Sequence, residues 1–292
     1  MTENLITEGK FTYAEAGEGQ AIVILHGLMG ALSNFDETFN YFSNKGYKVL
    51  IPELPLYSLP LLKTNIKNLA KFLNDFIVFK KLERVILVGN SLGGHIGLYF
   101  SKHYPDKVKA LVLTGSSGLY ENSMGDSYPR RGDRDYVTKK ARDVFYDPAI
   151  ATEELIDDVY VVINDRSSLI RTLAIAKSAI RHNMAKDLPK MKQPTCLIWG
   201  KQDKVTPPEV AVDFNKFLPE FSCLPFSSDF ASPSSKITVS SCTRIPNICW
   251  SISETHSSNF VSNQKSSESK KAIQSQSNEA SIPEFLAAPG PK

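Results

Sequence analysis

Several patterns are missing from this 292-residue sequence, and each absence excludes a class of protein. No apolar run approaches the roughly 18 residues that cross a bilayer, so we predict no membrane-spanning helix. Cys196, Cys223, Cys242 and Cys249 have neither the spacing of a metal site nor that of a disulfide framework, so reduced thiols are expected. The formal net charge is only +3 and the basic residues are dispersed, which argues against a nucleic-acid partner.

The first residues, MTENLITEGKFTYAEAGEGQ, lack the basic segment followed by an apolar segment that marks a secretory signal peptide. We therefore expect a cytoplasmic protein. Apolar residues make up 42% of the chain, which allows a sizeable core, and 22% charged residues are typical of a globular protein. The expected partner is a small molecule rather than a nucleic acid or a membrane.

Glycine nearly disappears in the last quarter of the chain. Residues 1–220 hold 15 of the 16 glycines and 12 serines, whereas residues 221–292 hold one glycine and 19 serines. Stretches such as ETHSSNFVSNQKSSESKK bury too little apolar surface to offset the entropy that ordering costs. We expect residues 221–292 to be disordered or to be translated out of frame.

Short apolar runs bounded by turn residues predict five strands. The runs are continuous rather than alternating, as in strands covered on both faces, and they are AIVILHG (21–27), KVLIPEL (48–54), RVILVGN (84–90), KALVLTG (109–115) and TCLIWG (195–200). Residues 64–79 place apolar side chains on one helical face, and a second helical pattern at 91–104 ends before a proline. Strands that alternate with helices predict an α/β fold around a mostly parallel sheet.

About 80 residues separate the fourth expected strand from the fifth, far more than a helical crossover needs. Helix-like pieces such as SLIRTLAIAKSAIRHNMAK lie in this stretch. We expect them to form a helical cap over the carboxyl edge of the sheet, where open α/β sheets bind ligands. The expected division is a core of residues 1–115 and 194–220, a cap at 116–193 and a serine-rich tail at 221–292, with no recognisable last strand and helix.

Gly89-Asn90-Ser91-Leu92-Gly93 matches the pattern G-x-S-x-G. An apolar strand leads into the pattern and a helix leads out of it, so the serine backbone is expected to be strained and its hydroxyl exposed. A Cβ at either flanking glycine would collide with the neighbouring strand or helix. A serine cap on an ordinary glycine-rich helix start is the alternative, and the context favours a nucleophile.

Two backbone N–H groups are expected to stabilise an oxyanion beside Ser91. Free N–H groups at a helix start favour an anion, and the N–H of Leu92 is the natural first donor. A second donor should come from a loop after another strand, and VILHGLMG (23–30) supplies the N–H of Leu28. We interpret His26 in the same loop as a structural histidine that braces the loop rather than as a base.

Asp203 lies just past the end of the run TCLIWG. A carboxylate at this position can orient an imidazole and stabilise its charged form. For this residue taken alone, an Asx turn before Pro207-Pro208 is the alternative. Together with the serine pattern and the His-Gly loop, Asp203 is predicted to be catalytic.

In this order, HGLMG, GNSLGGH and WGKQDKVTP, with an insertion before the last, resemble the α/β-hydrolase superfamily, and most closely its small bacterial esterases and carbon–carbon-bond hydrolases. The resemblance covers about residues 10 to 220. It implies the α/β-hydrolase fold, Ser91 as nucleophile, Asp203 as acid, and Leu28 and Leu92 as oxyanion donors, with neither metal nor organic cofactor. It also implies an acyl-enzyme formed from small, mostly apolar esters or activated carbon–carbon bonds.

The sequence departs from this family at the catalytic histidine. The family places its histidine roughly two to three dozen residues after the acid, behind a last strand and in a Gly-His setting. After Asp203 the sequence offers only His256, 53 residues on and inside the tail, where nothing local fixes its ring. His95, His103 and His182 are expected to be structural or solvated.

Two hypotheses therefore stay open at the sequence level. One is a serine hydrolase whose base is His256 or is encoded in a frame that changes near Pro219–Cys223. The other is a catalytically impaired descendant that keeps the pocket and binds a small ligand or a partner.

Sequencing the coding DNA downstream of the Asp203 codon and translating it in all three frames distinguishes a frame error in the sequence from a genuine tail. Because the composition changes abruptly within a family pattern, we expect a shifted frame to encode a strand followed by Gly-His. Confirmation of the present frame in directly sequenced protein would contradict this prediction.

Overall fold

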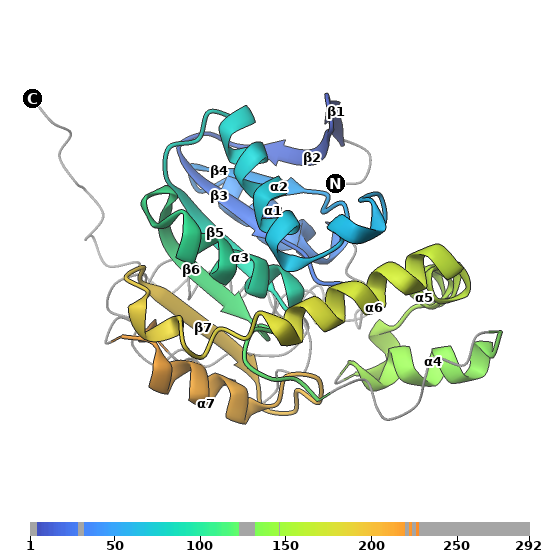
Figure 1. The fold of residues 1–292 in the computed structure, drawn as a ribbon. Helices are drawn as coiled ribbons and strands as arrows, with labels where there is room; N and C mark the ends of the chain where they lie inside the picture. The colour runs from blue at the N-terminus through green and yellow to red at the C-terminus, as the bar shows by residue number, and fades with distance from the viewer. Residues whose placement is uncertain are drawn as a thin grey trace, which may run out of the picture.

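The computed structural model describes residues 5–28, 32–122, 132–145, 147–219, 222–223 and 226–227. Within these ranges, one sheet lies between helices on its two faces (Figure 1). The strands are β1 (Ile6–Glu8), β2 (Phe11–Ala16), β3 (Gln20–Leu25), β4 (Tyr47–Pro52), β5 (Val85–Asn90), β6 (Val108–Thr114), β7 (Thr195–Gly200), β8 (Ser222–Cys223) and β9 (Phe226–Ser227). The helices are α1 (Asp36–Ser43), α2 (Ile66–Phe79), α3 (Leu92–His103), α4 (Arg134–Asp143), α5 (Glu153–Asn164), α6 (Arg166–Arg181) and α7 (Pro208–Phe217).

The sheet order is β1-β2-β4-β3-β5-β6-β7-β8, and β9 also pairs with β7. The pairs β1–β2 and β2–β4 are antiparallel, and every other pair is parallel. Strand β4 lies on one side of β3, whereas β5, β6 and β7 follow one another on the other side, so the direction in which strands are added reverses between β3 and β5. In open α/β sheets a crevice for ligands forms at such a reversal, outside the carboxyl ends of the strands.

The five strands predicted from apolar runs are confirmed as β3 to β7, each with ends within two residues of the expected ones. The two predicted helices are confirmed as α2 and α3. The side chain of Asn65 caps α2 by accepting a 3.0 Å hydrogen bond from the Asn68 N–H, which satisfies a donor that the first helical turn leaves free. Strands β1 and β2 and helix α1 were missed, because each is short and β2 contains alanine and glutamate, which have low strand propensity.

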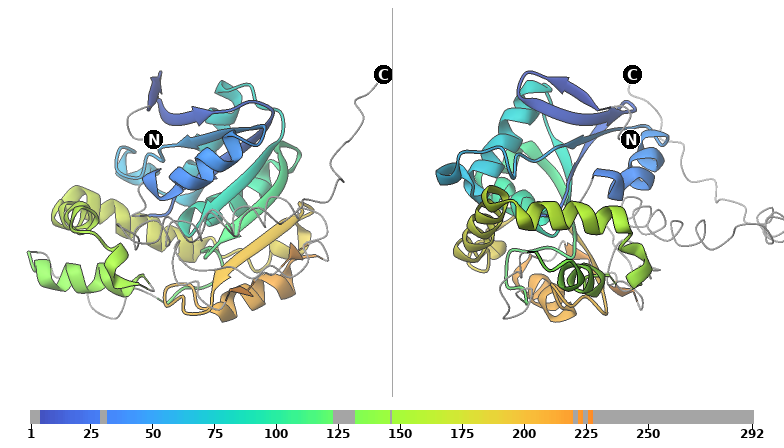
Figure 2. Two further views of the ribbon diagram at one scale, coloured as in Figure 1. Left: turned by 180° about the vertical axis from the view of Figure 1, so that it is seen from behind. Right: turned by 90° about the vertical axis from the view of Figure 1, so that its right-hand side faces the viewer.

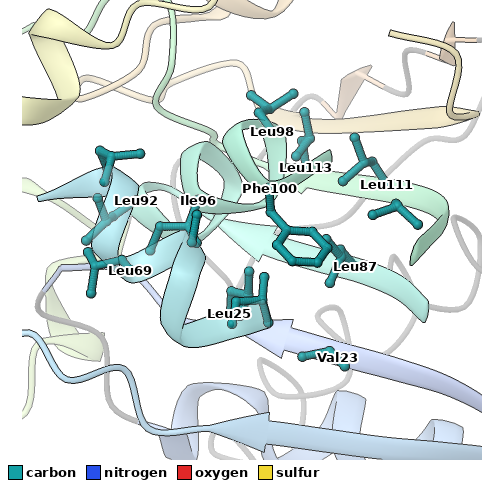
Figure 3. Packing of buried hydrophobic residues seen from close by; sticks show 14 of the residues in the cluster. Val23, Leu25, Leu69, Leu87, Leu92, Ile96, Leu98, Phe100, Leu111 and Leu113 are labelled. Atoms are coloured by element: carbon teal, nitrogen blue, oxygen red, sulfur yellow. The ribbon is translucent and has the colours of Figure 1, made fainter. Parts of the chain in front are cut away.

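Side chains of the central strands fill both faces of the sheet. One face packs against α2, α3 and α7, and the buried residues at its centre are Val23, Leu25, Leu87, Leu111, Ile96, Leu98 and Phe100 (Figure 3). The other face packs against α1 through Ile22, Ile24, Val88, Val112, Phe39 and Phe42. Coverage on both faces explains why these strands are continuously apolar in the sequence.

Helices α4, α5 and α6 follow β6 and lie to one side of the sheet, toward which the arrowheads of β6 and β7 point (Figures 1 and 2). The Ser178 hydroxyl of α6 accepts a 3.1 Å hydrogen bond from the Ile66 N–H of α2. His95 of α3 is fully buried and its Nε2 lies 3.0 Å from the carbonyl oxygen of His182 at the end of α6. These helices occupy the stretch where a cap is expected, and the expected division into core, cap and tail stays a prediction.

The sheet edge beyond β7 carries two short strands. Thr195 and Cys196 pair in parallel with Ser222 and Cys223 of β8, and Trp199 pairs with Phe226 of β9. Buried Cys196 forms a disulfide, so the expectation of reduced thiols throughout is wrong for this residue. The tail from 228 onward lies outside the described residues.

Within the described ranges, every helix is too short or too polar to span a membrane.

Candidate active site

Ser91 forms the turn between β5 and α3 with a φ of 50° and a ψ of −117°. Among the described residues other than glycine, only Lys81 shares a positive φ. The Ser91 N–H donates to the Thr114 carbonyl at 3.1 Å, and the Ser91 carbonyl accepts from the N–H of Ser117 at 3.1 Å. A backbone conformation of this kind costs about 1–3 kcal/mol and persists only where the surrounding structure holds it. Strand β6 and the residues that follow it provide this support.

The glycines on either side of Ser91 allow α3 to approach the sheet. A Cβ on Gly89 would lie 2.5 Å from the Cα of Gly94, and a Cβ on Gly93 would overlap the carbonyl oxygen of Leu25 at the end of β3. The predicted collision is therefore confirmed at both positions. Because α3 starts this close to the sheet, its first N–H groups lie beside the loop that follows β3.

The loop of residues 26–28 lies directly against Ser91. A Cβ on Gly27 would stand 3.5 Å from the Cβ of Ser91 and 3.3 Å from Oδ1 of Asn90. The structure therefore brings the two backbone segments that carry the predicted oxyanion donors, Leu28 and Leu92, to one place. Their roles as donors stay predictions.

His26 is buried and braces this loop. Its Nε2 accepts a 3.0 Å hydrogen bond from the Leu54 N–H, so Nδ1 carries the proton and donates to the Gly27 carbonyl at 2.8 Å. Burial lowers the pKa of His26, which favours the neutral ring. The interpretation of His26 as a structural histidine is confirmed.

His26 also sets the direction of the Leu28 N–H. The Gly27 carbonyl and the Leu28 N–H belong to one peptide group, and no peptide bond of the described residues is cis. In a trans peptide the two point to opposite sides. By holding the carbonyl, the imidazole fixes where the N–H points.

Asp203 follows β7 and forms a hydrogen-bonded turn. Its Oδ1 accepts from the N–H groups of Val205 at 2.9 Å and Thr206 at 2.8 Å, and its Oδ2 accepts from the Thr206 hydroxyl at 2.9 Å. The Asx turn considered as the alternative is therefore present. Burial raises the pKa of Asp203 in spite of these donors. Indole Nε1 of fully buried Trp199 donates to the Thr206 carbonyl at 2.7 Å and fixes the turn to the core.

The Asx turn does not remove Asp203 from the site. A Cβ on Gly115, the residue after β6, would lie 3.1 Å from Oδ2 of Asp203. Ser91, Gly115 and Asp203 thus follow three adjacent parallel strands and lie at one edge of the sheet. The second lone pair of Oδ2 can still accept from an imidazole N–H.

Glu121 is a second carboxyl beside Asp203, and it was not among the predicted site residues. Burial raises its pKa, and the charge of Asp203 raises it further, against a lowering by the hydroxyl of Ser117. Ser117 donates to Glu121 at 3.4 Å, and the Asn122 N–H donates to the Val205 carbonyl at 2.8 Å. The motif GSSGLYEN directly after a strand was the signal that could have indicated this segment.

No histidine in the described part of the chain forms a hydrogen bond with Ser91 or Asp203. The hydrogen bonds of the four described rings go to Gly27 and Leu54 for His26, to His182 for His95, to Tyr99 for His103 and to Ser178 for His182. Burial lowers the pKa of His95 to about 4, so this ring is neutral at pH 7. The predicted candidate base His256 lies outside the described residues. Across those residues, no cluster of His, Cys, Asp or Glu side chains fits a metal ion.

Comparisons with known proteins agree with this fold. A family model described as the alpha/beta hydrolase fold matches residues 20–147. A 2-hydroxy-6-oxo-6-phenylhexa-2,4-dienoate hydrolase of Comamonas testosteroni is 25% identical and aligns with 71% of this chain and 79% of its own. A 2-hydroxy-6-oxononadienedioate/2-hydroxy-6-oxononatrienedioate hydrolase of Paraburkholderia phymatum is 29% identical over 70% of this chain and 79% of its own.

Solved structures show the same fold. MGS-MChE2, an alpha/beta hydrolase enzyme from a sediment metagenome of the lagoon of Mar Chica, Morocco, is 55% identical, with a TM-score of 0.63 over 77% of this chain and 87% of its own. The esterase EaEST of Exiguobacterium antarcticum is 22% identical, with a TM-score of 0.62 over 75% of this chain and 87% of its own. The fold predicted from the sequence is confirmed.

Substitution of Gly93 by alanine tests the close approach of α3. Because the new methyl group would overlap the Leu25 carbonyl, Gly93→Ala should lower the free energy of unfolding by about 1–3 kcal/mol. Gly97→Ala is the matched control on the same helix, since its Cβ meets only side chains at 3.7 Å or more; it should raise stability by about 0.5–1 kcal/mol. Urea unfolding curves measure both. Equal stability of the two variants would contradict the account.

Proposed function

The chain belongs to the α/β-hydrolase family, and from that premise we propose that it is a serine hydrolase with Ser91 as its nucleophile. Its substrates are small, mostly apolar esters or activated carbon–carbon bonds. The observation that carries the proposal is the strained turn at Ser91, held between two close-packed glycines and against the loop of residues 26–28. The names of the curated relatives, hydrolases of 2-hydroxy-6-oxo dienoates, support the carbon–carbon-bond class.

In the proposed mechanism the Ser91 hydroxyl attacks the substrate carbonyl while a base takes its proton. The N–H groups of Leu28 and Leu92 stabilise the resulting oxyanion. The tetrahedral intermediate collapses to an acyl-enzyme, and the leaving group departs with the proton returned by the base. Water then attacks the acyl carbonyl, the base takes one of its protons, and the acid product leaves as Ser91 recovers its hydrogen. These steps need neither a metal nor an organic cofactor.

Asp203 is proposed to orient the base and to stabilise its charged form. It does so as a carboxylate, so activity should be present above its pKa and lost as the pH falls through that pKa. Because burial raises the pKa of Asp203, this loss begins at a higher pH than for an exposed aspartate. His256 is the one histidine after Asp203 in the sequence and is kept as the candidate base.

The histidines favour a second candidate function. None of the four described histidines reaches Ser91 or Asp203. Removing a triad histidine can cost on the order of 10⁶ in turnover, with roughly 10³–10⁴ over water remaining from the oxyanion hole and binding. A chain without a base would bind a small apolar ligand or a partner in the same site and release no product.

Location in the cytoplasm stays a prediction. The disulfide at Cys196 weighs against it, because disulfides persist mainly in oxidising compartments. A small molecule remains the proposed partner.

Hydrolysis of p-nitrophenyl butyrate and of 2-hydroxy-6-oxo-6-phenylhexa-2,4-dienoate tests the proposed function. Ser91→Ala should lower kcat/KM by roughly 10⁴–10⁶ and Asp203→Asn by roughly 10³–10⁴, because one loses the nucleophile and the other the orientation of the base. Ser101→Ala is the matched control, since Ser101 lies on the same helix and donates only to the Gly97 carbonyl.

The wild-type chain could be folded and bind the same compounds without turnover, and Ser91→Ala could leave this binding intact. That result would overturn the proposed catalysis and support the binding function. Turnover that survives Ser91→Ala would remove Ser91 from the proposal while leaving a hydrolase.

A further inference from the structure

We propose that residues 54–66, the strap, couple the position of helix α6 to the loop of residues 26–28, with Tyr57 as a positioning residue for the Leu28 N–H. The inference rests on the proposed function in one respect, the role of that N–H as an oxyanion donor. The strap leaves β4 and ends at α2, and contains the 3-10 helix η3 (Leu61–Lys63).

At one end, the strap holds both peptide groups around Leu28. The Leu54 N–H donates to Nε2 of His26 at 3.0 Å, and the other ring nitrogen of His26 holds the Gly27 carbonyl. The Tyr57 hydroxyl donates to the Leu28 carbonyl at 3.2 Å. The peptide before Leu28 and the peptide after it are therefore both fixed by contacts that originate in the strap.

At the other end, the strap is bound to α6. Nε of Arg171 donates to the Leu59 carbonyl at 3.0 Å, and the Ile66 N–H donates to the Ser178 hydroxyl at 3.1 Å. Between these two contacts the Thr64 hydroxyl donates to the Pro60 carbonyl at 3.1 Å and closes the turn. A displacement of α6 would therefore be transmitted to the backbone of the strap on both sides of η3.

Tyr57 lies within the strap, between its two ends. Its ring packs against the core, and burial raises the pKa of its phenol. Its hydroxyl donates to the Leu28 carbonyl, and Arg171 of α6 holds the carbonyl of Leu59, two residues further along the strap. The path from α6 to the loop of residues 26–28 therefore runs through the backbone of the strap between Leu59 and Tyr57.

The physical consequence concerns preorganisation. A backbone N–H stabilises an oxyanion most when it already points at the developing charge and does not have to rotate during the reaction. Loss of the Tyr57 bond frees the peptide that follows Leu28, and a shift of α6 moves the strap that carries Tyr57. A ligand that repositions α6 would therefore adjust the oxyanion donor from outside the reacting centre.

Amide hydrogen exchange and kinetics of the full chain test this coupling together. In Tyr57→Phe and in Arg171→Gln, the Leu54 amide, which wild type protects through His26, should exchange at least about three-fold faster. Tyr57→Phe should also lower kcat about ten-fold with KM unchanged, because an oxyanion donor stabilises the transition state and not the bound substrate. This loss is smaller than the roughly 10²–10³-fold fall in kcat that follows removal of a donor, because the N–H is still present.

Arg134→Gln is the matched control. It removes the contacts of an arginine of α4 with Glu153 and Asp157 and touches no residue of the strap, so exchange at Leu54 should stay at the wild-type rate. Arg171→Gln is measured alongside Tyr57→Phe so that misfolding of one variant leaves the other decisive.

Two failures are distinguishable. If wild type has no turnover but both strap variants accelerate exchange at Leu54, the coupling holds and the proposed hydrolase function fails. If wild type hydrolyses ester and Arg171→Gln exchanges like Arg134→Gln, the coupling is overturned while the hydrolase function stands.

Discussion

The close approach of helix α3 to strands β3 and β5 is the constraint on which the rest of the site depends. Helix α3 begins directly against the sheet, because glycine at positions 89 and 93 leaves the space that a Cβ would occupy. Ser91 connects β5 to this helix with a positive φ. The buried side chains that α3 shares with the central strands stabilise this contact and offset the strain of the turn (Figure 3). This close approach brings Ser91, the first N–H groups of α3 and the loop of residues 26–28 together.

Around this turn, burial shifts the pKa values of four ionisable groups in the direction that favours their uncharged forms. Burial lowers the pKa values of His26 and His95, and both rings instead serve as fixed hydrogen-bonding groups. Burial raises the pKa values of Asp203, which follows β7, and of Glu121, which follows β6. The role proposed for Asp203 requires its charged form, so the raised pKa restricts that role on the acid side of the pH range.

The sequence predicts those parts of the fold that depend on residues contiguous in the chain. Continuous apolar runs indicated the five central strands, and the glycines around Ser91 indicated the turn and its collisions. Contacts between distant segments could not be predicted in this way. Tyr57 contacts Leu28 and Arg171 contacts Leu59 although these residues are far apart in the chain, and no local periodicity indicates such contacts. Glu121 was missed because its chemistry arises from the nearby Asp203, which follows a different strand.

The central claim is that the turn at residue 91 presents a reactive hydroxyl in this chain. Mass spectrometry of the folded full chain after treatment with a fluorophosphonate, followed by peptide mapping, measures it directly. The account predicts one added phosphonyl group, located on the peptide that contains Ser91. A folded chain that remains unlabelled, or that carries the label on another serine, would contradict it.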